Sequence, residues 1–252
     1  MKALAVIGYH HTGKTTAVTA IVRYLSGLGY KVATIKDIHS EKFRADSPGK
    51  NSALHIEAGS IQTVARGLYD TAVVYPYPLP LHDIVPKIEA DFLIIEGMKD
   101  APMPKIVCAK EPAELDELVD DCTIGISGKI SDGTYSHPRL PVLSAIRAEK
   151  DLGELVLQKS FEILPIPEPD CCSRCGGTCF QMAADIVQGR RNRADCVLDQ
   201  KNSLSLKVGG KEVTIVPFVQ DILQDCILAI VNNLRDIEAG KEIEIRIHHE
   251  GE

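Results

Sequence analysis

The sequence predicts an α/β protein in which helices flank a mostly parallel sheet, followed by a small α+β domain rich in cysteine. An apolar strand over 3–7 leads into a glycine-bounded loop and then into a helix over 15–28 with one apolar face. A strand over 31–36 completes a βαβ unit, whose crossover implies a parallel sheet. Five of the eight cysteines fall between positions 171 and 196, beyond these elements.

The composition is that of a globular protein with a substantial core. The chain has 252 residues and a formal net charge of −7, which argues against dedicated nucleic-acid binding. No apolar run approaches the roughly 18 residues that span a membrane, and residues 1–7 are too short for a signal peptide. We therefore expect a cytoplasmic protein, in which clustered cysteines indicate a metal site rather than disulfides.

The loop after the first strand has the spacing of a phosphate-binding loop, with two glycines followed by Lys and Thr. Gly8 and Gly13 permit a tight backbone path, whose N–H groups wrap a phosphate chain at the start of a helix. Lys14 would reach the terminal phosphates, and Thr15 would hold Mg²⁺. The candidate nucleotide-binding residues are Gly8, Tyr9, His10, His11, Thr12, Gly13, Lys14, Thr15 and Thr16.

The remaining elements of the first domain follow from apolar runs and turn residues. The polar segment 37–50 predicts a loop, and the prolines within 75–80 predict an extended connector. In order, the pattern predicts a helix over 52–58, strands over 63–66 and 71–75, a helix over 81–88, strands over 91–96 and 105–109, a helix over 112–119, strands over 121–127 and 141–143, and a helix over 145–159.

Two acids stand where parallel strands are expected to end. Glu96 closes the strand over 91–96, and Asp37 follows the strand over 31–36. Open α/β sheets bind ligands at this edge, where a carboxylate can hold Mg²⁺ or its waters. Glu96 is therefore the first candidate to share Mg²⁺ with Thr15, and Asp37 is the second. Asp37 could instead order the attacking water or only anchor its loop. The candidate catalytic residues are Lys14, Asp37 and Glu96.

A proline-rich segment over 163–169 indicates a stiff linker, so the expected domains are 1–162 and 163–252. The second domain is expected to contain a helix over 178–188, a β-hairpin with strands over 204–208 and 211–216, a helix over 217–234 and a final strand over 243–247.

Four cysteines of the second domain have the spacing of a metal site, with two, three and sixteen residues between them. Four thiolates suit tetrahedral zinc or a [4Fe–4S] cluster, and absence of metal is the third alternative. The segment resembles the 4Fe-4S domain of corrinoid and acetyl-CoA pathway proteins, with one residue fewer between the second and third cysteines, and we expect the cluster ahead of zinc. The candidate ligands are Cys172, Cys175, Cys179 and Cys196, with Cys171 as a substitute for Cys172. The thiols expected in the core are Cys108, Cys122 and Cys226.

Several segments of the first domain resemble the molybdopterin-guanine dinucleotide biosynthesis protein B (MobB) family. The phosphate loop marks only a superfamily, whereas the later segments are more specific. They are Val32-Ala33-Thr34-Ile35-Lys36, Asp46-Ser47-Pro48-Gly49-Lys50-Asn51-Ser52 with Glu57-Ala58-Gly59, Ile95-Glu96-Gly97-Met98-Lys99 and Pro102-Met103-Pro104-Lys105-Ile106. The resemblance covers roughly residues 1–160.

This resemblance implies a protein that binds GTP and Mg²⁺, hydrolyses GTP weakly and can form a homodimer. The implied partners are molybdopterin or its guanine dinucleotide, the MobA-type guanylyltransferase that attaches GMP to molybdopterin, and a molybdoenzyme apoprotein. The cofactor metal is molybdenum or tungsten. GTP rests on the resemblance alone, because the chain lacks the Asn-Lys-x-Asp motif of regulatory GTPases.

The chain departs from the family pattern in two places. His10 and His11 stand where small residues are usual, and Asp37 stands where His is frequent. Phosphate binding is unaffected, because backbone amides and Lys14 provide it. The two histidines could stack on or hydrogen-bond the nucleotide, or they could be exposed loop side chains.

Basic residues could meet the phosphates of a second ligand, such as the pterin cofactor, or form a solvated face. Lys50 is favoured because Pro48 and Gly49 bend the chain beside it. The residues concerned are Arg44, Lys50, Lys99 and Lys105.

The leading interpretation is a GTP-binding accessory protein of molybdenum or tungsten cofactor biosynthesis with an iron–sulfur domain. One alternative is an NTP-driven kinase or metal-insertion ATPase, with the cluster as a relay. The other alternative is a binding scaffold without turnover.

Overall fold

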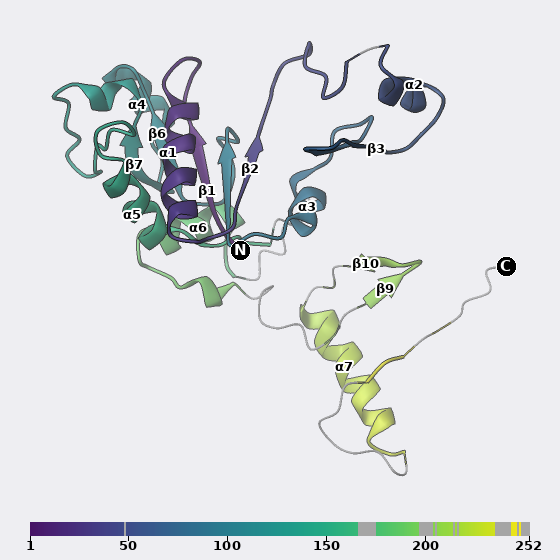
Figure 1. The fold of residues 1–252 in the computed structure, drawn as a ribbon. Helices are drawn as coiled ribbons and strands as arrows, with labels where there is room; N and C mark the ends of the chain where they lie inside the picture. The colour runs from purple at the N-terminus through teal and green to yellow at the C-terminus, as the bar shows by residue number, and fades with distance from the viewer. Residues whose placement is uncertain are drawn as a thin grey trace. The chain divides into compact units, whose positions relative to one another are not determined.

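The computed structural model divides the chain into two compact units, residues 1–196 and residues 197–252 (Figure 1). It describes residues 1–47, 49–165, 175–196, 204, 206–213, 215, 217–234, 243–245 and 247. In these ranges, no helix has the length and apolar character needed to cross a membrane.

A mostly parallel sheet forms the centre of the first unit, as the sequence predicts. The strand order is β2-β5-β1-β6-β7, and all four neighbouring pairs are parallel. The short strand β8 pairs antiparallel with β1 at the start of the chain. The strands are β1 (Lys2–Ile7), β2 (Val32–Lys36), β5 (Phe92–Glu96), β6 (Lys105–Cys108), β7 (Thr123–Ser127) and β8 (Phe161–Glu162). The strand expected over 141–143 contributes one parallel bridge, between Val142 and Ile126.

Side chains of the central strands alternate between two apolar cores, one on each face of the sheet. Leu4 and Val6 of β1 contribute to the core that contains α1 (Lys14–Gly27) and α5 (Glu149–Lys159). Ala3 and Ala5 contribute to the core that contains α4 (Pro112–Leu118). Because both faces are covered, these strands are continuously apolar rather than alternating with polar residues.

The segment between β2 and β5 contains the expected short elements. They are α2 (Asn51–Glu57), the antiparallel pair β3 (Thr63–Arg66) and β4 (Thr71–Val74), α3 (Leu81–Ile84) and the 3₁₀ turn η1 (Val85–Lys87). Residues of α3 and η1 pack against the core that contains α4.

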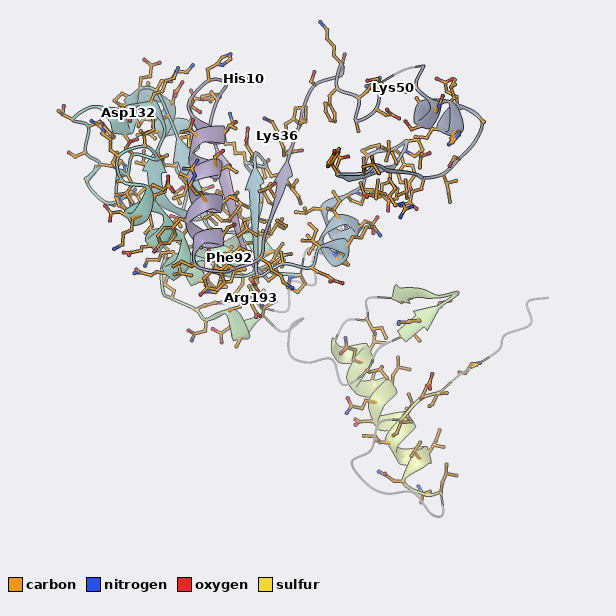
Figure 2. All side chains as sticks on the ribbon, viewed as in Figure 1. His10, Lys36, Lys50, Phe92, Asp132 and Arg193 are labelled. Atoms are coloured by element: carbon orange, nitrogen blue, oxygen red, sulfur yellow. The ribbon has the colours of Figure 1, made fainter. Side chains whose placement is uncertain are left out.

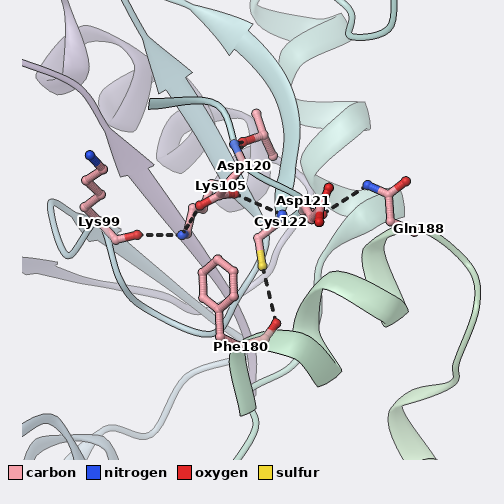
Figure 3. Close-up of polar contacts among 8 residues, drawn as sticks. Lys99, Lys105, Asp120, Asp121, Cys122, Phe180 and Gln188 are labelled. Carbon is pink, nitrogen blue, oxygen red and sulfur yellow. Dashed lines mark hydrogen bonds and ion pairs between the residues drawn. The ribbon is translucent and has the colours of Figure 1, made fainter. Parts of the chain in front are cut away.

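The first unit extends past the predicted boundary at residue 162 because α6 (Cys179–Val187) packs on it. Cys122 Sγ contacts the Phe180 carbonyl oxygen at 3.8 Å, and Gln188 Nε2 donates to the Asp121 carbonyl oxygen at 3.1 Å (Figure 3). Arg193, in the 3₁₀ turn η3 (Arg193–Asp195), donates to the carbonyl oxygens of Glu162 and Ile163. The part of the expected linker beyond residue 165 lies outside the described residues.

The second unit contains the expected hairpin and helix. Strands β9 (Leu206–Val208) and β10 (Lys211–Val213) pair antiparallel across Gly209 and Gly210, and α7 spans Pro217–Val231. Residues 243–245 and 247 are not in a strand. The strand expected over 243–247 is therefore not formed in these residues. An alternating pattern is not sufficient for a strand, because a strand also needs a partner for its backbone hydrogen bonds.

Candidate nucleotide-binding site

The loop between β1 and α1 has a backbone path that glycine alone permits at its first position. Gly8 has φ 151°, and a Cβ atom there would lie 2.2 Å from the carbonyl oxygen of Cys108 in β6. Thr12 is fully buried, and its hydroxyl donates to the Tyr9 carbonyl oxygen at 3.0 Å. The loop is therefore fixed against the neighbouring strand before any ligand arrives.

Lys14 begins α1 and turns its ammonium group back over the loop. Its Nζ atom donates to the carbonyl oxygens of Gly8, at 2.9 Å, and Tyr9, at 2.6 Å. These bonds keep one positive charge at the helix N-terminus, where the helix dipole also favours an anion.

A carboxylate from β5 lies against the first turn of α1. The Thr15 hydroxyl lies 3.1 Å from both carboxylate oxygens of Glu96. Lys36, at the end of β2, places its Nζ atom 3.2 Å from Glu96 Oε1. The Glu96 side chain is only 12% exposed, so this pairing is partly shielded from water. The prediction that Thr15 and Glu96 share a metal rested on Glu96 standing at the carboxyl end of a parallel strand. The parallel pairing of β1 with β5 brings the two residues together.

Asp37 lies next to this group but has its own partner. Its backbone N–H donates to the Glu96 carbonyl oxygen at 2.9 Å. Its carboxylate oxygen Oδ2 lies 2.8 Å from His39 Nε2. The carboxylate is therefore engaged within its own loop, as in the anchoring alternative.

Tyr9 has a contact that the sequence did not indicate. Its phenol donates a hydrogen bond to the carboxylate of Glu117 in α4. This bond, reinforced by the negative charge, raises the pKa of Tyr9. The partners are 108 positions apart, so local spacing carries no signal of the pair. His10 and His11 are exposed, with ring centroids 6.4 Å apart.

One of the four proposed basic ligand contacts is wrong. Lys105 is fully buried, with its ammonium 2.6 Å from Asp120 Oδ2 and 4.6 Å from the centre of the Phe180 ring (Figure 3). It cannot reach a ligand, because α6 covers it. Arg44, Lys50 and Lys99 are exposed, and Pro48 lies outside the described residues.

The described cysteines do not form a metal site. Cys171 and Cys172 lie outside the described residues. Within the described parts of the chain, no three His, Cys, Asp or Glu side chains are placed to hold a metal ion, so the expected grouping of Cys175, Cys179 and Cys196 is not formed. Cys175 Sγ instead contacts the carbonyl oxygen of Gly177 at 3.4 Å.

The three thiols expected in the core have different environments. Cys108 and Cys122 are buried, and burial raises the pKa of each to about 12. Cys226 is exposed on α7, so the prediction is wrong there.

The strand-to-helix loop, the parallel sheet and the acid at the end of β5 define the first unit as an α/β protein of the phosphate-loop class. Figure 2 shows His10 of the loop after β1, Lys36 at the end of β2 and Asp132 of the turn after β7 along the edge at which the parallel strands end.

Residues 3–132 match the sequence model of the family described as molybdopterin guanine dinucleotide synthesis protein B (MobB), and the chain belongs to this family. A protein of Methanocaldococcus jannaschii, provisionally named a molybdopterin-guanine dinucleotide biosynthesis adapter protein, is 29% identical over 98% of this chain and 97% of its own length. The Haemophilus influenzae protein named a molybdopterin-guanine dinucleotide biosynthesis adapter protein is 29% identical over 46% of this chain and 70% of its own length.

The fold is also similar to that of a solved relative. The crystal structure of Bacillus subtilis MobB aligns with a TM-score of 0.53 and 26% identity, covering 63% of this chain and 97% of that protein. More than a third of this chain therefore has no counterpart in the Bacillus structure, whereas the Methanocaldococcus relative matches nearly the full length of this chain.

Proposed function

We propose that this protein is a GTP-binding adapter in the biosynthesis of molybdopterin guanine dinucleotide, with molybdenum or tungsten as the cofactor metal. The family and the names of its relatives support this role. The observation that carries the nucleotide proposal is the grouping of Lys14, Thr15 and Glu96 around one loop.

Lys14 would exchange its two carbonyl acceptors for phosphate oxygens. Both acceptors are neutral, whereas a phosphate is charged, so the Lys14 ammonium would gain an attraction between opposite charges in addition to its hydrogen bonds. The loop N–H groups and the start of α1 would supply the remaining contacts. Gly8 would allow the loop to adopt this path, because a side chain at this position would collide with β6.

The donors present fit Mg²⁺, which prefers hard oxygen ligands. Thr15 offers a hydroxyl and Glu96 a carboxylate, already within 3.1 Å of each other. The ammonium of Lys36 beside Glu96 shows that positive charge is favourable at this point. When bound, Mg²⁺ would neutralise phosphate charge. Lys36 would then give up its contact with Glu96.

We propose weak hydrolysis because the residues that could activate water are already engaged. Asp37 pairs with His39, and Glu96 with Thr15 and Lys36. The site is thereby better arranged for binding than for rapid turnover. The proposed partners are molybdopterin or its dinucleotide, the MobA-type guanylyltransferase, a molybdoenzyme apoprotein and a second copy of this chain.

Nucleotide binding and turnover test this function. The full chain should bind a fluorescent GTP analogue with Mg²⁺, and Lys14→Ala should abolish that binding. GTP hydrolysis should be slow alone and change when molybdopterin-loaded guanylyltransferase is added. Fast unassisted turnover, with ATP as good as GTP, would instead identify an NTP-driven kinase or metal-insertion ATPase. Binding without hydrolysis, even with the partner, would identify a scaffold.

We also propose that Cys172, Cys175, Cys179 and Cys196 hold a [4Fe–4S] cluster. Their spacing supports this, because four thiolates suit such a cluster. Anaerobically purified protein should be brown, with broad absorption near roughly 400 nm. A colourless protein with one zinc ion would contradict the cluster and support a zinc site. A metal-free protein would contradict both.

A further inference from the structure

The turn after β7 is fixed to the phosphate loop. This turn, η2 (Lys129–Asp132), begins with a backbone N–H of Lys129 that donates to the Thr12 carbonyl oxygen at 3.0 Å. The N–H of Ile130 donates to the Ala109 carbonyl oxygen at 2.9 Å. A Cβ atom at Gly128 would lie 2.4 Å from the Thr12 carbonyl oxygen, so only glycine allows this approach. The position of Asp132 is therefore set relative to the loop.

A serine that follows the isolated bridge residue Val142 holds the Asp132 carboxylate. Ser144 Oγ donates to Asp132 Oδ1 at 2.9 Å and accepts the N–H groups of Ile146 and Arg147, each at 3.3 Å. Arg147 Nη2 also donates to the Ser131 carbonyl oxygen at 3.1 Å. Two segments that are separate in sequence are thereby joined by the Asp132 carboxylate and the Ser131 carbonyl oxygen.

A cavity of about 420 Å³ begins where the phosphate loop ends. Its lining consists of residues of α1, the turn that follows Ser144 and the start of α5, and it does not include Asp132 or Ser144. The lining residues are Thr15, Thr16, Thr19, Ala20, Arg23, Ala145, Ile146 and Glu149. Ala145 directly follows Ser144, so the cavity wall and the serine that holds Asp132 belong to the same turn. The volume lies within the range of small-molecule sites.

The Asp132 carboxylate can accept hydrogen bonds but, when ionised, cannot donate them. Its contacts with Ser144 and, at 3.8 Å, with Arg147 both involve Oδ1, and the side chain is 48% exposed. Guanine presents two adjacent donors, N1–H and the 2-amino group, which match the two carboxylate oxygens. Adenine presents an acceptor at N1 and has no 2-amino group, so it leaves the carboxylate unmatched.

We propose that Asp132, held by Ser144, recognises the guanine base of the bound nucleotide. The inference rests on the proposed function, because the phosphate loop must hold the nucleotide for the base to reach this point. Asp132 would thereby select guanine in a chain that lacks the Asn-Lys-x-Asp motif of regulatory GTPases. Asp132 is the fourth residue after Gly128, and Ser144 lies 12 positions further on, so the pair has no contiguous motif.

Base preference in the full chain tests the proposal. Fluorescent diphosphates of guanosine, inosine, xanthosine and adenosine would be titrated with wild type, Asp132→Asn and Asp151→Asn. Wild type should prefer GDP to ADP by about 100-fold or more, since sites built for specific hydrogen bonds reject mismatched ligands strongly. Inosine lacks the 2-amino group, so IDP should bind about 10-fold more weakly than GDP.

Asp132→Asn should weaken GDP binding by about 10- to 100-fold and strengthen XDP binding. The asparagine amide donates to the 2-oxo group of xanthine and accepts from its N1–H. This gain is a readout that a misfolded variant would not show. Asp151→Asn removes the same charge from an exposed position on α5 and should leave all preferences unchanged.

Each contrary result separates the two proposals. Equal binding of GDP and ADP by wild type, abolished for both by Lys14→Ala, overturns base recognition and keeps nucleotide binding. A folded Asp132→Asn variant that retains GDP preference, or loses it without gaining XDP, also overturns the role of Asp132. If wild type binds none of the four nucleotides, the proposed function fails and this inference fails with it.

Discussion

Lys105 is the most sharply testable stabilising residue of the first unit, because its charge is fully buried. Its ammonium contacts Asp120 at 2.6 Å, the Lys99 carbonyl oxygen and the Phe180 ring. Removing one partner of a buried ion pair costs about 3–5 kcal/mol, because the remaining charge stays desolvated. The Asp120 side chain is 27% exposed, so water can partly replace it. We expect Asp120→Asn to lower the free energy of unfolding by about 2–3 kcal/mol.

Substitution of the lysine should lower the free energy of unfolding by less than substitution of the aspartate. Lys105→Met removes the buried charge at similar volume, and Asp120 keeps its bond from the Cys122 N–H at 2.9 Å. We expect Lys105→Met to lower the free energy of unfolding by about 1 kcal/mol. The double variant should lose less than the sum of the two single losses. Urea unfolding followed by circular dichroism measures the series, and Asp121→Asn is the matched control on the same loop. A loss for Asp120→Asn below that for Lys105→Met would refute the argument.

Three further outcomes are expected. Lys36→Met should lower the Mg²⁺ concentration needed for nucleotide binding by up to about fivefold, measured by titration, because its ion pair is partly exposed; an unchanged requirement would contradict this competition. Exposed Cys226 should react with a thiol reagent at pH 8, whereas Cys108 should stay unmodified, because Cys108 is buried and its pKa is about 12. Mass spectrometry of labelled peptides reports the modification of both cysteines. The raised pKa of Tyr9 means that its bond to Glu117 persists at neutral pH and is lost as pH rises through that value, so Tyr9→Phe should remove a high-pKa step from the ultraviolet titration of tyrosine.

The sequence predicts the phosphate loop because all its determinants are local. Gly8, Lys14 and Thr15 have fixed spacing between an apolar strand and a helix, and the fold places them as that spacing requires. Glu96 is 81 positions from Thr15, yet their contact was predictable, because parallel strands end at the same edge.

Charge alone misled the prediction for Lys105. A lysine is rarely fully buried, so an exposed position is the natural expectation. Its burial depends on Asp120, 15 positions away, and on Phe180 of α6, whose packing no local pattern reveals. The predicted boundary at 162 differs from the observed unit for the same reason, since a proline-rich linker does not indicate where the next helix packs.

Three internal contacts hold the side chains on which the proposed nucleotide binding depends. Lys14 is bonded to two carbonyl oxygens, Lys36 to Glu96, and Asp132 to Ser144. In the proposed complex, phosphate would displace the first pair of bonds and Mg²⁺ would displace the second, whereas the third would leave Asp132 Oδ2 for the base. Ligands that offer only one of these three features would leave the other costs uncompensated. We therefore expect the tightest binding when phosphates, metal and a matching base are present together, which suits an adapter that reports a complete nucleotide to a partner.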